Sequence, residues 1–175
     1  MTVEDYKSAV TSSAVLERLE PFDPRIVGTL PLGLAVSGSD IDIVCHVLDP
    51  NAFTDIVWKH YRSADDFVLY RWTSGTRPAI AHFVWDGWPF ELFGDQRPVE
   101  QQRGWIHFEV ERRLLALDDG RLRRAVGTLR AGGLKTEPAF AAVLRISGDP
   151  YQGLLELAVE TDAGLRARLA ACDPG

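Results

Sequence analysis

The 175-residue sequence has few cysteines and no long apolar run. Its two cysteines, Cys45 and Cys172, are too few and too far apart for a disulfide framework or a zinc knuckle. No apolar segment approaches the roughly 18 residues that a membrane-spanning helix needs, and the N-terminus lacks the basic and then apolar pattern of a secretion signal. We therefore expect a soluble, cytoplasmic protein without a membrane partner, in which Cys45 is a small buried apolar residue.

Positive charge is also scarce, because 19 Lys and Arg residues stand against 25 Asp and Glu residues, which gives a net charge of −6. Binding to duplex nucleic acid without sequence preference depends on many Lys and Arg contacts to phosphates, so we expect no duplex partner. The basic residues are nevertheless unevenly distributed. A cluster of this kind is typical of a solvated helix face, and it is also what a positive wall facing an anionic ligand would contain. Its members are Arg112, Arg113, Arg121, Arg123, Arg124, Arg130 and Lys135.

The composition, 46% hydrophobic and 25% charged, is that of a globular protein. A chain of this length can bury roughly two-thirds of its unfolded surface, which is enough for a core without disulfides or metals. Strand patterns dominate before residue 98 and helix patterns dominate after it. We therefore expect an α+β fold, with a mixed β-sheet flanked by helices over residues 1–97 and a helical C-terminal unit over residues 98–175.

The individual elements follow from periodicity and turn residues. Asp86-Gly87 lies between aromatic and β-branched runs, which favours a two-residue hairpin turn. Asn51 and Thr136 are the expected helix caps. The pattern predicts helices over 3–20, 51–61, 100–117, 120–131, 137–146 and 150–171, and strands near 40–48, 66–73, 79–85 and 88–93.

Two acids, Asp40 and Asp42, stand at the head of the apolar run that continues to Val47. Residues i and i+2 of a strand share a face and lie roughly 6.6 Å apart along the chain. Two carboxylates ~5 Å apart repel each other by about 3 kcal/mol at an effective dielectric constant of 20. The pair is stable if a cation relieves the repulsion, if one acid is protonated, or if both are solvated. Mg²⁺ in proteins is bound by one or two carboxylates together with substrate phosphates.

The residues upstream of this pair favour the cation. Gly28 and Thr29 precede a short predicted helix, where backbone N–H groups approach phosphate oxygens closely and the threonine hydroxyl adds a donor. A phosphate cradle beside a metal-binding pair of acids suits a nucleoside triphosphate with its Mg²⁺ ion.

The stretch "GTLPLGLAVSGSDIDI" resembles the signature of the nucleotidyltransferase superfamily, which includes DNA polymerase beta, poly(A) polymerases and small bacterial nucleotidyltransferases. Gly28, Gly33, Ser39, Asp40 and Asp42 match that pattern. Threonine replaces the usual serine after the first glycine and keeps the hydroxyl. The chain is also similar to a narrower bacterial family within the superfamily, whose members carry "GT-P-LG", "SD-DI" and, later, "KTEPAFA".

The match has departures as well. Pro31, Leu32 and Val36 stand where the small bacterial members of the superfamily commonly have basic and polar residues.

The resemblance implies a third carboxylate on a later strand beside the Asp-x-Asp strand. Glu91, between Phe90 and Leu92, is the expected residue, because a glutamate in an apolar strand is costly to bury without a partner. The alternative for Glu91 is an edge strand from which it points to solvent. Asp86 is explained by its turn, and Asp95 follows the predicted end of the strand.

In this interpretation Asp40, Asp42 and Glu91 bind Mg²⁺ or Mn²⁺ and are the catalytic residues, with Glu91 as a possible general base. Gly28, Thr29 and Ser39 bind the nucleotide. The helical half adds Lys135, which is either a phosphate ligand or an ordinary surface lysine.

The expected reaction moves a nucleoside monophosphate from a nucleoside triphosphate to a hydroxyl on a small molecule or a protein, with release of pyrophosphate. Two alternatives remain. One is a catalytically degenerate member that binds a nucleotide or a partner without turnover, and the other is an unrelated α+β interaction module without a metal. His82 and His107 are expected to be packed or surface residues.

Overall fold

The computed structural model describes residues 5–172, which divide into two compact units with the boundary between Trp105 and Ile106. Within the described range no helix combines the length and the apolar character needed to cross a bilayer. The first unit contains α1 (Asp5–Ser12), α2 (Val15–Arg18), η1 (Glu20–Phe22), β1 (Arg25–Val27), α3 (Thr29–Leu32), β2 (Ile41–His46), α4 (Pro50–Tyr61), β3 (Asp65–Arg71), β4 (Ala79–Trp85), β5 (Trp88–Asp95) and η2 (Val99–Gln101). Helix α5 (Arg103–Leu117) begins in the first unit, and α6 (Arg121–Ala131), α7 (Thr136–Val143), α8 (Pro150–Ala158) and α9 (Asp162–Ala171) follow in the second.

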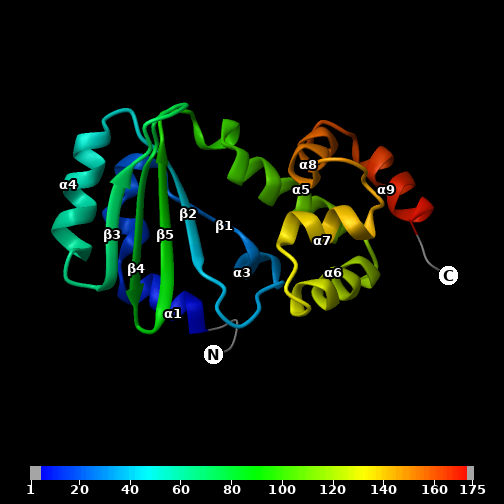
Figure 1. Ribbon diagram of the computed structural model, residues 1–175, viewed down its shortest axis with the longest axis horizontal. Coiled ribbons are helices and arrows are strands. Elements are labelled where there is room, and N and C mark those ends of the chain that lie inside the picture. The colour runs from blue at the N-terminus through cyan, green and yellow to red at the C-terminus, as the bar shows by residue number, and fades with distance from the viewer. Residues whose placement is uncertain (1–4, 173–175) are drawn as a thin grey trace. The chain divides into compact units, whose positions relative to one another are not determined.

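The first unit is built on a five-stranded mixed sheet with the strand order β1-β2-β5-β4-β3 (Figure 1). Strands β2 and β5 pair in parallel, and the other neighbours pair antiparallel. The hairpin predicted at Asp86-Gly87 is confirmed, because both turn residues have positive φ and Trp85 pairs with Trp88. The α+β fold class expected from the sequence is therefore confirmed.

One face of the sheet carries the hydrophobic core, against which α1, α2 and α4 pack (Figure 1). A stack of rings runs through it: Tyr61 lies on Phe83 with ring centroids 4.5 Å apart, and Phe83 lies on Phe90 at 4.9 Å. Cys45 is fully buried in this core, as expected, and burial raises the pKa of its thiol. Because side chains alternate along a strand, burying these residues places their neighbours in sequence on the opposite face.

The prediction of one continuous helix over residues 3–20 is wrong, because α1 ends at Ser12 and α2 begins at Val15. Residues 1–4 lie outside the described range, and the remainder is interrupted at Ala14, whose φ of 50° is left-handed. The Tyr61 hydroxyl donates a hydrogen bond to the Ser13 carbonyl at 3.1 Å, so the fully buried tyrosine satisfies an acceptor at the break. A tertiary contact here outweighs local helix propensity.

Three further details of the prediction are corrected. Helix α4 is capped by Asp49, whose carboxylate accepts hydrogen bonds from the N–H groups of Asn51 and Ala52, so Asn51 is not the cap. Lys135 occupies the N-cap position of α7, and Thr136 is the first helical residue. The helical segment expected over residues 150–171 is two helices, of which the second is capped by the Thr161 hydroxyl.

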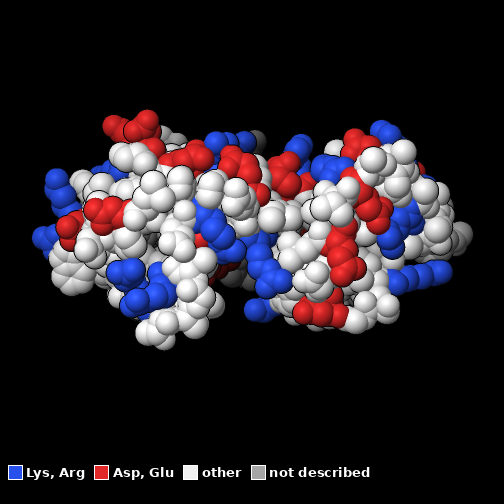
Figure 2. All heavy atoms as spheres, turned by 90° about the horizontal axis from the view of Figure 1, so that it is seen from above, with Lys and Arg blue, Asp and Glu red and all other residues white. Residues whose placement is uncertain are grey.

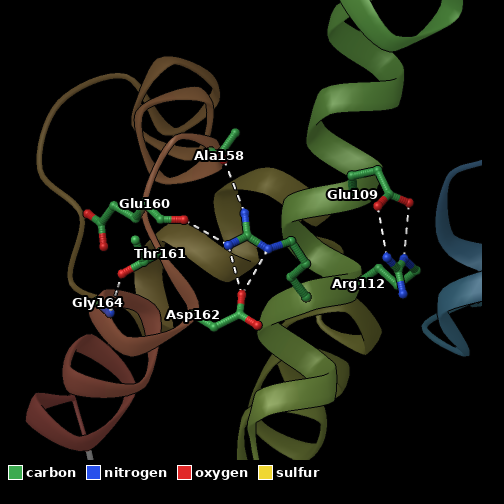
Figure 3. A network of polar contacts seen from close by, with 8 residues as sticks. Glu109, Arg112, Ala158, Glu160, Thr161, Asp162 and Gly164 are labelled. Atoms are coloured by element: carbon green, nitrogen blue, oxygen red, sulfur yellow. Dashed lines mark hydrogen bonds and ion pairs between the residues drawn. The ribbon is translucent and has the colours of Figure 1, made fainter.

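The helical unit is held together by an ion-pair network as well as by apolar packing (Figure 3). The Arg113 guanidinium on α5 donates hydrogen bonds to the carbonyl oxygens of Ala158 and Glu160 at 3.1 and 2.7 Å, and to Asp162 Oδ1 at 2.8 Å. Ala158 is the last residue of α8, Glu160 lies in the connection that follows, and Asp162 is the first residue of α9. The Arg113 side chain therefore binds carbonyl oxygens that have no helical partner at the end of α8.

A second polar cluster is buried against α5 in the same unit. His107 Nδ1 lies 3.5 Å from Glu137 Oε1, and its other ring nitrogen lies 3.0 Å from the Tyr151 carbonyl oxygen. His107 is therefore packed, as the sequence suggests. Glu111 is 3% exposed, and burial, reinforced by the charge of Glu137, raises the pKa of its carboxyl well above the usual value.

Candidate active site

The candidate site lies on the face of the sheet that is opposite the core. It is defined by Asp42, His82 and Glu91. The strand register brings these residues together. Asp42 on β2 pairs with Glu91 on β5, and Glu91 pairs with His82 on β4. Side chains of directly paired residues point to the same face of a sheet, so the three form a row across the central strands.

Gly28 places the backbone directly against this row. It follows β1 with φ 76° and ψ −159°, a conformation open essentially to glycine alone. A Cβ atom built on Gly28 would lie 2.0 Å from Asp42 Oδ2. The absence of a side chain at position 28 therefore allows the Asp42 carboxylate to lie against the main chain at the start of α3.

Thr29 and Ser39 fix the loop that joins α3 to β2. Both are 8% exposed, and the Thr29 hydroxyl donates a long hydrogen bond of 3.4 Å to Ser39 Oγ. Ser39 Oγ also accepts from the Val36 N–H at 2.9 Å. Because Ser39 immediately precedes Asp40, this bonding determines where the acidic pair enters β2.

Asp40 lies one residue before β2, which begins at Ile41, and it is half-buried. Asp40 and Asp42 are two residues apart in the sequence, and of the two only Asp42 lies within the strand. Within residues 5–172, however, no group of three or more His, Cys, Asp or Glu side chains is arranged closely enough to hold a metal ion. The joint role of Asp40, Asp42 and Glu91 as metal ligands therefore remains a prediction.

Glu91 contacts a residue to which the sequence assigned no function. Glu91 Oε2 lies 3.7 Å from His82 Nδ1, and both side chains are a little over one-third exposed, at 38% and 39%. The other ring nitrogen of His82 lies 3.4 Å from the Tyr70 hydroxyl, and the two rings stack with centroids 6.0 Å apart. His82 thus connects Glu91 to an aromatic ring on the edge strand.

The hairpin contained the signal that would have identified His82. A two-residue turn that pairs Trp85 with Trp88 fixes every later pair of the ladder, and counting outward places His82 opposite Glu91.

The two rivals of Glu91 as the third carboxylate, Asp86 and Asp95, have structural partners of their own. Asp86 is in the hairpin turn and accepts a hydrogen bond from the Ser12 hydroxyl. Asp95 is 1% exposed and is bound by Thr76 and by Arg97, whose guanidinium donates to it at 2.9 and 3.0 Å. Burial acts to raise the pKa of Asp95, but these hydrogen bonds outweigh it and lower the pKa. Asp95 therefore has a structural partner that accounts for it.

Lys135 is exposed and belongs to the helical unit, at the N-cap position of α7. Its expected contact with phosphates stays a prediction.

The chain belongs to the family described as a domain of unknown function, DUF4269, which matches residues 8–157. No curated protein sequence is significantly similar to it. Solved structures of nucleotidyltransferases share its fold, at identities that establish the fold alone.

The terminal uridylyl transferase Cid1 matches with a TM-score of 0.60 and 15% identity, over 81% of this chain and 48% of Cid1. A chain of the GLD-2/RNP-8 complex matches with a TM-score of 0.57 and 10% identity, over 97% of this chain and 76% of that one. The polymerase core of TRAMP, an RNA surveillance complex, gives a TM-score of 0.51 and 18% identity, over 89% and 56% of the two chains. This chain spans about half the length of Cid1 and of a cytoplasmic RNA terminal U-transferase, at 48% and 46%.

Proposed function

We propose that this protein is a metal-dependent nucleotidyltransferase that moves a nucleoside monophosphate from a nucleoside triphosphate to a hydroxyl acceptor. The observation that carries the proposal is the meeting of Gly28, Asp42 and Glu91. A backbone segment without a side chain lies against one carboxylate, and a second carboxylate is in register with it on the neighbouring parallel strand. Cid1, which has the same fold, has been solved with MgGTP and with MgATP bound.

Asp40, Asp42 and Glu91 are the residues that would hold Mg²⁺ or Mn²⁺. Carboxylate oxygens are the donors that these hard cations prefer, and the absence of a side chain at Gly28 lets the Asp42 carboxylate lie against the main chain. When bound, the ion supplies charge neutralisation for the triphosphate. The partly exposed Glu91 also remains accessible to an incoming substrate.

The chain's own residues position the reactants. Gly28 lies against Asp42, and with Thr29 and Ser39 it would supply backbone N–H groups and hydroxyls for phosphate oxygens. Glu91 accepts the proton of the acceptor hydroxyl, and His82 orients the Glu91 carboxylate through its Nδ1. The acceptor oxygen bonds to the α-phosphorus, the bond from that phosphorus to the bridging oxygen breaks, and pyrophosphate leaves with the electron pair.

The acceptor we propose is a small molecule or a protein. Figure 2 shows acidic as well as basic side chains on one face of the molecule, and the whole sequence has 19 Lys and Arg residues against 25 Asp and Glu residues, whereas a nucleic-acid track requires many cations. Val68, Tyr70 and Trp72 on and beside the edge strand β3 are exposed by 51%, 40% and 52%. Because Val68 pairs with His82, this apolar strip continues the row that contains Glu91 and can receive an uncharged part of an acceptor.

A second candidate is a protein that binds a nucleotide or a partner without turnover. The specific observation in its favour is the apolar character of α3, where Leu32 is 4% exposed and Pro31 also replaces a polar residue. A triphosphate at α3 would then depend on backbone donors and the metal ion, with no cationic side chain from this helix.

The two candidates differ in turnover. We would measure binding of Mg·ATP by calorimetry, and pyrophosphate release in the presence of hydroxyl acceptors, for the wild type, Asp42→Asn and Glu91→Gln. The matched control is Asp55→Asn, which makes the same change on the exposed side of α4. Metal-dependent binding and release that both acid variants lose, and that the control keeps, would support the enzyme.

Binding by the wild type without release for any acceptor would favour the second candidate. Absence of metal-dependent binding of ATP, GTP, CTP and UTP would refute both the enzyme and the nucleotide-binding protein.

A further inference from the structure

The helical unit contains a cavity of about 800 Å³ that the proposed reaction does not use. Small-molecule sites in proteins commonly have volumes of about 300–1,000 Å³. Helices α6, α7 and α9 form its walls. Four of its lining residues are arginines: Arg121, Arg124, Arg145 and Arg166. The apolar lining residues include Leu122, Ala125, Val143, Leu144 and Leu169.

The charges at the rim do not cancel. Asp118 also lines the cavity, but its carboxylate accepts hydrogen bonds from the N–H groups of Gly120 and Leu122 at 2.7 and 2.8 Å and so caps α6. Asp119 is paired with Arg121 at 2.9 Å. Across the described part of the chain, the guanidinium groups of Arg145 and Arg166 have no ion pair or hydrogen bond.

Other arginines of the same unit are bound to carboxylates. Arg112 pairs with Glu109, Arg113 with Asp162, and Arg168 with Glu160, at 2.8–2.9 Å. Ion pairing to acids is therefore common among the arginines of this unit, and Arg145 and Arg166 leave unpaired positive charge at the cavity in a chain of net charge −6.

Arg145 adds an independent observation from the backbone. It follows α7 in the left-handed region, with φ 53°, and the Ile146 N–H donates to the Ala141 carbonyl at 2.9 Å across it. Glycine is the residue favoured at this position of a helix end, because a Cβ atom is strained there. Strain in a surface arginine without a partner indicates a function for that side chain.

We propose that this cavity is a second binding site, for an organic anion with an apolar body and a phosphate or carboxylate head. The apolar walls receive the body, and Arg145 and Arg166, with Arg124, bind the head through charge-assisted hydrogen bonds. This site contains none of the residues that we propose for the transfer reaction.

The test uses the full chain and the fluorescent aromatic sulfonate 8-anilinonaphthalene-1-sulfonate. We expect saturable binding that decyl phosphate displaces at least tenfold more effectively than decanol, inorganic phosphate or ATP. Arg145→Gln and Arg166→Gln should each weaken binding about tenfold, equivalent to about 1.4 kcal/mol. Arg123→Gln, which removes the same charge from an exposed α6 residue outside the cavity, should change binding by less than about twofold.

Arg145→Gly separates binding from folding. Because glycine relieves the strain, its melting temperature should equal or exceed that of the wild type while it loses binding to the same extent as Arg145→Gln. Unchanged binding in the Arg145 and Arg166 variants would overturn the proposal. If decanol displaced the dye as effectively as decyl phosphate does, the charged head would not contribute to binding. If inorganic phosphate did so, the apolar body would not contribute. If ATP displaced the dye as effectively or more so, the cavity would be a nucleotide site. Any of these three results also overturns it.

Discussion

Replacing Gly28 by alanine tests the candidate active site at its closest contact. The new Cβ would lie 2.0 Å from Asp42 Oδ2, and Cβ contacts below 3.0 Å are essentially never seen. The Asp42 carboxylate must therefore move by about 1 Å, which is the difference between these two distances. A misplacement of this size in a catalytic arrangement lowers a rate about 100-fold.

The same change strains the backbone. Holding alanine in the conformation of Gly28 costs about 1–3 kcal/mol, and each kcal/mol lowers the melting temperature of a chain of this size by about 2–4 °C. Gly38→Ala is the matched control, because Gly38 also has a positive φ of 82° but a Cβ atom there meets nothing within 4 Å. The control shares the strain in φ and lacks the contact with Asp42.

The assay is Mg·ATP binding by calorimetry, followed by pyrophosphate release, with thermal melts of both variants. We expect Gly28→Ala to remain folded, to bind Mg·ATP at least tenfold more weakly, and to lose activity as Asp42→Asn does. Gly38→Ala should melt a few degrees lower and keep its binding. If Gly28→Ala binds Mg·ATP as the wild type does, the position of the Asp42 carboxylate does not determine the site and the reasoning is refuted.

Two further predictions concern buried acids. Asp95→Asn should destabilise the first unit by about 2 kcal/mol in chemical denaturation, because a charge paired with the partly exposed Arg97 is lost. Because the pKa of Asp95 is lowered in the folded state, its charge contributes to the free energy of unfolding above the usual pKa of 3.8, and this contribution is lost as the pH falls through the folded-state pKa. The free energy of unfolding of the variant should therefore fall less steeply with decreasing pH than that of the wild type. An identical dependence on pH would contradict this. The pKa of Glu111 is raised in the folded state, so its contribution to the free energy of unfolding is present below the usual pKa of 4.5 and is lost as the pH rises through the folded-state pKa. Glu111→Gln should therefore be at least as stable as the wild type near neutral pH and flatten the fall of melting temperature with rising pH, and a steeper fall would show that the buried carboxyl is charged.

Local sequence chemistry predicts the hairpin, and the hairpin fixes more than its turn. Because the chain reverses through Asp86 and Gly87, the pairing of His82 with Glu91 follows by counting from the turn. The contact therefore follows from the turn and the strand sequence, whereas residue type alone predicts only a packed or surface histidine. When two antiparallel strands are joined by a two-residue turn, the turn determines which of their residues pair.

The pairing of Asp42 with Glu91 could not be predicted in the same way. Strands β2 and β5 are parallel, and α4, β3 and β4 lie between them in the sequence. No turn fixes the register of such a pair, so it depends on how the whole core packs. The resemblance to nucleotidyltransferases implied an acid on a neighbouring strand, whereas its alignment with Asp42 is a property of the folded sheet.

The break at Ala14 shows a second limit of local patterns. Alanine is the strongest helix former, and the apolar spacing of residues 3–20 continues through it. The chain nevertheless turns there, and the buried Tyr61 hydroxyl bonds to the carbonyl of the preceding residue. A contact between residues so distant in sequence cannot be detected from periodicity.

The parallel pairing of β2 with β5 has a consequence for biosynthesis. The two strands that carry Asp42 and Glu91 can associate only after residues 47–87 have been made and β5 has left the ribosome. Contacts between distant segments form late and slowly in folding. A nascent or prematurely terminated chain that ends before β5 therefore lacks the paired acids, so the nucleotide transfer that we propose could begin only once the sheet is complete.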